Sequence, residues 1–137
     1  MQKVAEILVE ELKSQGIPCA GVNEAENRTI VNVAVSGKYN SYGVIFIFNA
    51  EHDVEIAAMR IAVCPENKRK NLYPALNDFN SQCRWGKLVV MPNGDVNMRC
   101  DAVVSEETVG GTCVEIFLRI TKMVEDVYPA VSKALWS

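Results

Sequence analysis

Apolar residues recur at helical spacing over residues 2–15, with glutamates and lysines on the opposite side, which predicts an amphipathic helix. The apolar positions of this face are Val4, Ile7, Leu8 and Leu12. Gly16 and Pro18 end the pattern, because glycine adopts the left-handed cap conformation readily and proline cannot continue a helix. An extended piece through Val22 and a turn over residues 23–27 are expected next.

Three strand patterns follow closely. Residues 28–36 alternate between apolar and polar, and residues 42–49 are continuously apolar, as in a strand covered on both faces or central in its sheet. Residues 53–64 change parity near Ala57 and Ala58, which indicates either a β-bulge there or a change in burial. The links between these strands are too short for crossovers, so we expect antiparallel hairpins.

A second helix is predicted over residues 67–82, although Pro74 leaves open a start near Tyr73. Two further strands, 87–91 and 96–104, surround Asn93-Gly94, a dipeptide typical of a type I′ turn. The second of these strands alternates, and it places Arg99 and Asp101 on a solvent-facing side.

Gly110-Gly111 is interpreted as a break before the final helix, with Thr112 and Glu115 forming a capping box. Pro129 is expected to kink or divide that helix. Its apolar arc is wider than one packing seam needs, since Ile116, Ile120, Met123 and Val127 broaden it. Such an arc suggests a second contact, which we interpret as another subunit.

The predicted order is helix, three strands, helix, two strands, helix, without repeats or a linker. This order indicates an α+β protein with three helices packed on one mostly antiparallel sheet of about five strands. The 137 residues suit a single domain, residues 1–137.

Charge and cysteine usage narrow the function classes. The net charge of −3 offers no basic footprint for nucleic acid, so we expect no such partner. Five cysteines without a Cys-x-x-Cys spacing, and a carboxylate-rich start unlike a secretory leader, favour reduced thiols in the cytoplasm. No apolar run approaches the roughly 18 residues of a membrane span, so no membrane association is expected.

Candidate chemistry is sparse. His52 stands between Glu51 and Asp53, but consecutive turn side chains diverge, so a solvated turn is favoured over a metal site. The guanidinium in Cys83-Arg84 is able to activate a thiolate, yet a packed cysteine is the favoured interpretation. The scattered carboxylates Asp95, Asp101, Glu106 and Glu107 are also assigned structural roles. We therefore predict no catalytic, cofactor-binding or metal-binding residues.

The segment LNDFNSQCRWGKLVVMPNGDVNMRCDAVV, followed by a helix carrying YPAVSKAL, resembles the YbjN family of bacterial sensory-transduction regulators. The marks that carry the resemblance are Leu76, Asn77, Asn80, Asn93-Gly94, Tyr128 and Leu135. It implies the fold of the type III secretion chaperones, whose members are non-enzymatic, often dimeric, and bind proteins through sheet and helix surfaces. The family has no catalytic residues to carry over.

We expect a non-enzymatic protein-binding domain, regulatory or chaperone-like, that forms a homodimer. Its predicted interaction surface comprises Arg99, Asp101, Ile116, Ile120 and Met123. The alternative is a small-molecule-binding domain or enzyme with a cleft near the 83–101 hairpin. The candidate residues of that cleft are Cys83, Arg84, Trp85, Arg99 and Asp101.

Overall fold

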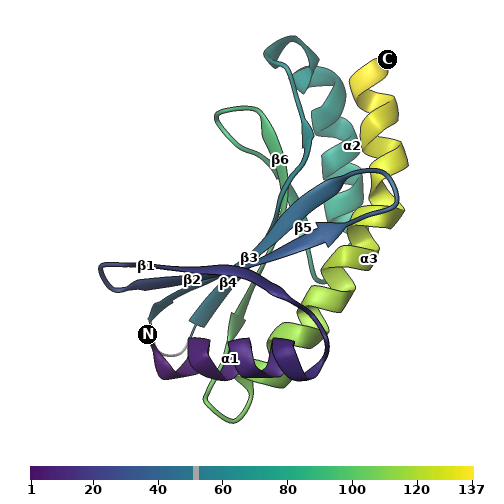
Figure 1. Ribbon diagram of the computed structural model, residues 1–137. Coiled ribbons are helices and arrows are strands. Elements are labelled where there is room, and N and C mark those ends of the chain that lie inside the picture. The colour runs from purple at the N-terminus through teal and green to yellow at the C-terminus, as the bar shows by residue number, and fades with distance from the viewer. Residues whose placement is uncertain (51–52) are drawn as a thin grey trace.

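The computed structural model describes residues 1–50 and 53–137 (Figure 1). Its elements are α1 (Lys3–Ser14), β1 (Cys19–Ala25), β2 (Arg28–Ser36), β3 (Ser41–Ala50), β4 (Asp53–Val63), the 3₁₀ turn η1 (Glu66–Lys68), α2 (Arg69–Gln82), β5 (Lys87–Val90), β6 (Asp95–Val103) and α3 (Val109–Trp136). The predicted α+β class and helix–strand order are confirmed. The sheet of the described ranges has six strands where about five were expected.

The strands form one sheet in the order β1-β2-β3-β4-β6-β5, and every neighbouring pair is antiparallel. The hairpins predicted for β2–β3 and β3–β4 are present, and β3 lies centrally, in agreement with its continuous apolar run. The strand after α2 does not pair with β4. Instead β6 lies between β4 and β5, so β5 forms an edge of the sheet.

The additional strand, β1, was expected only as an extended piece followed by a turn over residues 23–27. It pairs with β2 from Cys19 to Ala25, and the connecting turn shortens to Glu26 and Asn27, where Asn27 has a φ of 59°. Most of β1 is exposed, and its sequence CAGVNEA mixes small, apolar and polar residues. Pairing with β2 therefore determines its conformation, since its own residues carry no apolar alternation.

The loop between β5 and β6 corrects the prediction of a type I′ turn. Such a turn needs positive φ at both central residues, but of Asn93 and Gly94 only Gly94 has it, at 94°. The Gly94 N–H donates to the Met91 carbonyl at 2.8 Å, and the Met91 N–H donates to the Asp95 carbonyl at 2.7 Å. The loop is thus a three-residue connection, Pro92-Asn93-Gly94, with glycine in the left-handed position.

The irregularity predicted in β4 lies further along the strand than Ala57-Ala58. The pairing of β4 with β6 shifts between Ala58 and Ala62, and Arg60 has a φ of 54°. Asn97 of β6 is only 2% exposed, and its Oδ1 accepts the Arg60 N–H at 2.7 Å. This side chain therefore satisfies a backbone donor that the bulge removes from the ladder.

The helix α2 begins at Arg69, directly after η1, and continues through Pro74 to Gln82. The alternative start near Tyr73 is therefore wrong. Pro74 lies close to the helix start and has no N–H to donate. The one helical hydrogen bond that is lost is therefore the bond to the Lys70 carbonyl, in the first turns of α2.

The start of α3 differs from its prediction. Gly110 and Gly111 belong to the helix, and Thr112 is not a capping residue. The chain enters α3 through a turn in which the Thr108 Oγ1 accepts the Ser105 N–H at 2.8 Å. Gly110 is buried against α1, since a Cβ there would lie 3.2 Å from the Cβ and Cγ of Glu11. The glycine therefore permits close helix approach rather than a break.

The helix α3 is continuous through Pro129. Figure 1 shows it running obliquely over its first half and upright over its second half. Its wide apolar arc is used within the chain, because α3 contacts α1, α2, β4 and β6. No helix in residues 1–50 and 53–137 is long and apolar enough to cross a membrane.

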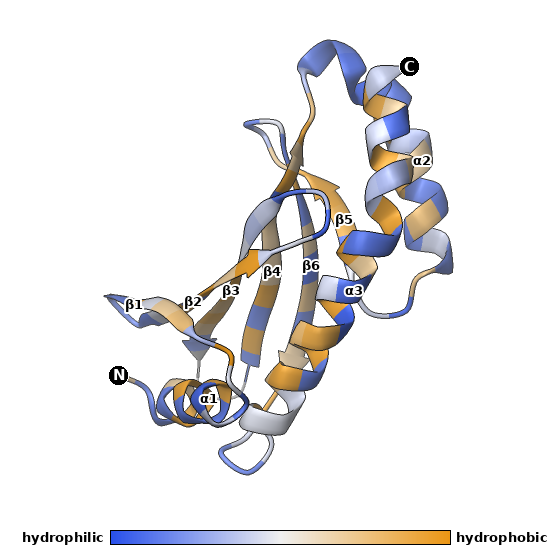
Figure 2. Cartoon of the chain, turned by 45° about the vertical axis from the view of Figure 1, so that its right-hand side comes forward, coloured by the Kyte–Doolittle hydropathy of each residue, from blue (hydrophilic) through white to orange (hydrophobic). Residues whose placement is uncertain are grey.

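The core lies between the sheet and the three helices. Figure 2 shows α2 and α3 along one side of the sheet, with α1 at the end formed by β1 and β2. The largest fully buried side chains come from both layers: Phe46, Phe48, Leu8, Leu12, Ile56, Ile61, Leu72, Met98 and Ile120. One face of the sheet is thereby covered, and within the described ranges no helix packs on the other face.

Candidate functional site

The face of the sheet opposite the helices is called the open face here. Strand residues alternate between the two faces, so Val31, Val33 and Phe46 point into the helix-covered core. Their neighbours Asn32 and Ile45, which are directly opposite each other in the β2–β3 ladder, point to the open face. Both are half-buried.

The centre of the open face is apolar. We call this the open-face stripe, which consists of Ile30, Ile45, Ile47, Ala57 and Met59 on β2, β3 and β4. The ladder places Ile47 opposite Ile30, and Ala57 opposite Ile45. Ile47 and Ala57 are 8% and 4% exposed, so their neighbours seal them, while Ile30, Ile45 and Met59 remain half-buried.

A polar cluster borders the stripe on the β6 side. The Arg99 guanidinium lies 2.8 Å from Glu55 Oε1, and Asn49 Nδ2 donates to Glu55 Oε2 at 2.7 Å. Asp101 stands opposite Glu55 in the β4–β6 ladder and is exposed. Arg99 and Asp101 thus lie on the open face, with Arg99 reducing the repulsion between two facing carboxylates.

The helix residues of the predicted interaction surface lie elsewhere. Ile116 and Ile120 are 8% and 0% exposed and belong to the hydrophobic core of this chain. Met123 is half-buried, with its Sδ 3.9 Å from the Cys83 Sγ. The prediction that Ile116 and Ile120 belong to an interaction surface does not fit their burial, because α3 packs them against the rest of the chain. Leu118 of the same helix remains 53% exposed.

The candidate residues of the alternative cleft do not converge. Cys83 contacts Met123 of α3 and therefore lies on the helix side of the sheet. Arg84 stacks on Trp85. Arg99 and Asp101 point to the opposite, open face. These side chains are divided between two faces, so they do not line one cleft.

The cysteines have the properties of packed thiols. All five are free. Burial raises the pKa of Cys113 to about 12, and burial also raises the pKa values of Cys64 and Cys100, with the Asp101 carboxylate adding to the rise at Cys100. A raised pKa keeps these thiols protonated near neutral pH, which opposes nucleophilic roles for these three.

The remaining candidates for metal or acid–base chemistry are dispersed. Glu51 and His52 lie outside the described residues. Within residues 1–50 and 53–137, no group of three or more histidines, cysteines or carboxylates is arranged to hold a metal ion. Asp95 lies 3.7 Å from the Arg60 guanidinium. Glu107 lies in the turn before α3, where its own backbone amide and the Ser105 side chain lower its pKa.

Sequence reasoning missed the open-face stripe. The apolar run of β3 was attributed either to cover on both faces or to a central position, and the second explanation holds. The signal that could have revealed the stripe was the second parity of that run, Ile45 and Ile47, together with Ile30 of β2. Pairing these residues required the register, which the sequence did not give.

This architecture, three helices on one face of a six-stranded antiparallel sheet, defines an α+β protein whose described residues show no assembled catalytic group. The chain belongs to the YbjN family: the family model described as "Putative bacterial sensory transduction regulator" matches residues 5–132. The predicted family is therefore confirmed.

A solved structure shares the fold. The crystal structure of YbjN from E. coli, described as "a putative transcription regulator", is 11% identical in sequence and superimposes with a TM-score of 0.58. The match covers 92% of each chain. No curated protein sequence matches this chain.

Proposed function

We propose that this YbjN-family protein is a non-enzymatic regulator that binds another protein on the open face of its sheet. The observation that carries the proposal is the one-sided cover of the sheet: all three helices pack on one face, and the other presents the open-face stripe. The family description as a regulator supports the same class of function.

The composition of the open face is that of a protein interface. Apolar side chains form its centre on β2, β3 and β4, and charged side chains, Glu55, Arg99 and Asp101, form one border. Protein interfaces combine an apolar centre with a polar rim. The isoleucine and methionine side chains at the centre stabilise a complex because binding removes their apolar surface from water. The Glu55–Arg99 pair is partly exposed, so it contributes more to the choice of partner than to affinity.

Homodimerisation and a cytoplasmic location stay predictions from the sequence. The apolar arc of α3 that suggested the dimer contacts the rest of the same chain. Light scattering of the purified protein over a range of concentrations tests for a dimer.

The proposal is tested by affinity capture from the native cell with the wild-type protein and an Ile45→Lys variant, followed by a binding assay with the purified partner. Lysine at Ile45 places a charge at the centre of the stripe, so we expect affinity to fall at least about tenfold, or about 1.4 kcal/mol. Tyr73→Lys is the matched control, because Tyr73 is 49% exposed on α2.

Both variants should melt near the wild-type temperature, which shows that they fold. Radical footprinting adds a direct measurement, since a bound partner should protect Met59 from oxidation. A partner whose affinity is unchanged by Ile45→Lys but lost with Tyr73→Lys would move the site to the helices and refute the open-face proposal.

A further inference from the structure

The loop between α2 and β5 is held firmly from several directions. The Lys87 ammonium donates to the carbonyls of Asn80, at 2.9 Å, and Cys83. Gly86 is buried so tightly that a Cβ would lie 2.7 Å from the Met98 Cγ. The backbone of residues 83–87 is therefore fixed between the end of α2 and the sheet.

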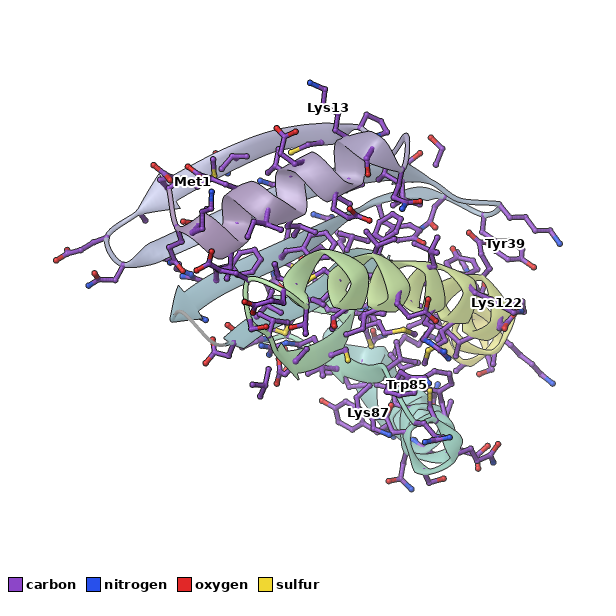
Figure 3. All side chains as sticks on the ribbon, turned by 90° about the horizontal axis from the view of Figure 1, so that it is seen from below. Met1, Lys13, Tyr39, Trp85, Lys87 and Lys122 are labelled. Carbon is purple, nitrogen blue, oxygen red and sulfur yellow. The ribbon has the colours of Figure 1, made fainter. Side chains whose placement is uncertain are left out.

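A tryptophan of this fixed loop lies against two arginines. Trp85 is 43% exposed, and its ring centroid lies 5.4 Å from the Arg84 Cζ and 5.0 Å from the Arg119 Cζ. Arg119 comes from α3, where Glu115 holds its guanidinium at 2.9 Å. Figure 3 shows Trp85 and Lys87 close together beside α2. We call Arg84, Trp85, Lys87 and Arg119 the Trp85 patch.

The charge of the patch is opposite to that of the whole protein. Glu115 neutralises Arg119, while Arg84 and Lys87 have no carboxylate within ion-pair distance in the described part of the chain. The chain as a whole carries a net charge of −3. An exposed tryptophan with unneutralised cations is thus concentrated on an otherwise acidic protein.

From this arrangement we infer that the Trp85 patch binds an acidic segment of a partner protein, which adds a second surface to the protein-binding role proposed above and rests on it. Guanidinium groups donate paired hydrogen bonds to carboxylates. Tryptophan and arginine are the residues that most often dominate the energy of protein interfaces. Because the loop is already fixed, binding there orders few additional groups.

A carboxylate-bearing protein segment fits the patch better than nucleic acid does. Nucleic-acid affinity comes mainly from many phosphate contacts along an extended polyanion. The patch offers only three cations, and the remainder of this acidic chain repels a long polyanion. A short acidic segment contacts the patch alone and avoids that repulsion.

Fluorescence provides the test, because the chain has two tryptophans. In a Trp136→Phe variant Trp85 is the single tryptophan and reports directly on its own patch. We would titrate this full-length variant with a glutamate-rich peptide, with a lysine-rich peptide of equal length, and with a double-stranded oligonucleotide. We expect saturable binding of the glutamate-rich peptide that weakens as salt is added, and none of the lysine-rich peptide.

The arginines are then tested in the same background. The double substitution Arg84→Gln, Arg119→Gln should weaken binding of the glutamate-rich peptide at least about tenfold. The matched control, Lys13→Gln with Lys133→Gln, removes the same charge from exposed lysines outside the patch and should change affinity less than about twofold.

Three outcomes would overturn the inference: no saturable peptide binding, equal weakening by both pairs of substitutions, or tighter binding of the oligonucleotide at equal salt. The titration needs no native partner, so its failure leaves the open-face capture experiment standing. Conversely, a failed capture with intact peptide binding would count against the open face alone.

Discussion

The side-chain amide of Asn80 pairs with both backbone groups of Leu88. Its Oδ1 accepts the Leu88 N–H at 2.8 Å, and its Nδ2 donates to the Leu88 carbonyl at 3.0 Å. The amide thereby takes the place of a neighbouring strand at the edge of β5. Asn80 lies in the last turn of α2, where an asparagine side chain is also able to bond to the open carbonyls of its own helix. The acceptor and donor belong instead to a strand eight residues further on.

Replacing Asn80 with alanine should lower the free energy of unfolding by about 2 kcal/mol, because two hydrogen bonds to partly buried backbone groups are lost. Urea denaturation measures this change. Asn77→Ala is the control, since Asn77 is exposed on the same helix and the substitution has the same helix propensity effect. Equal losses for both variants would contradict the role of Asn80 at the edge of β5.

Arg60 offers a test of backbone strain at the β4 bulge. Its φ of 54° is unfavourable for any residue with a Cβ, so Arg60→Gly should be more stable than Arg60→Ala by about 1 kcal/mol. Both variants lose the contact with Asp95, so their difference isolates the backbone term. Chemical denaturation of the pair measures it, and a more stable alanine variant would argue against the left-handed conformation.

The two glycines at the start of α3 should respond oppositely to alanine. Gly111 has no atom within 4 Å of a new Cβ, so Gly111→Ala should raise the free energy of unfolding by about 0.5 kcal/mol through reduced backbone entropy. At Gly110 the new Cβ would lie 3.2 Å from Glu11 and force α1 and α3 apart, so that gain should vanish or reverse. Thermal melts of both variants compare the effects.

Alkaline pH should destabilise the protein through two buried acids. Burial, together with the Glu125 carboxylate, raises the pKa of Tyr42 to about 12 from 10.0, and burial raises the pKa of Cys113 to about 12 from 9.0. The unfolded chain therefore loses these protons at lower pH than the folded chain. Stability should be constant below about pH 9 with respect to these groups and should fall between about pH 9 and 12.

Tyr42→Phe separates the two contributions. Within the described residues the Tyr42 hydroxyl has no hydrogen-bond partner, so its removal should leave stability near neutral pH unchanged or higher. The substitution should also reduce the loss of stability at alkaline pH, as measured by urea midpoints on either side of pH 10. Tyr73→Phe, at an exposed position, should follow the wild type. If Tyr42→Phe loses as much stability at alkaline pH as the wild type, the loss comes from other groups.

The order of helices and strands could be predicted because apolar residues recur at different spacings in helices and in strands. The period of α1 and the alternation of β2 and β6 are properties of consecutive residues, and the structure has these elements at nearly the predicted bounds. The same alternation correctly separated Arg99 and Asp101 from the core side of β6. These are local features that one segment determines by itself.

The errors arose where a residue's state depends on a distant partner. Most of β1 is exposed and its residues do not alternate between apolar and polar, so its ladder with β2 makes it a strand. Ile116 and Ile120 suggested a second subunit because the apolar face of α3 is wide. That width is explained by packing of α3 against the sheet and two helices of the same chain. The Asn93-Gly94 turn was assigned from a dipeptide, while the β5–β6 register and the contact of Gly94 with Cys64 determined the loop.

The α+β class, the hairpins and the family resemblance could be predicted from the sequence, because periodicity, short links and local motifs are properties of neighbouring residues. The tertiary arrangement was needed to show which face of the sheet stays uncovered, which apolar residues lie together there, and that Arg119 contacts Trp85. The reason is that surfaces form from residues far apart in the chain, and their register and packing follow from the energy of the whole fold.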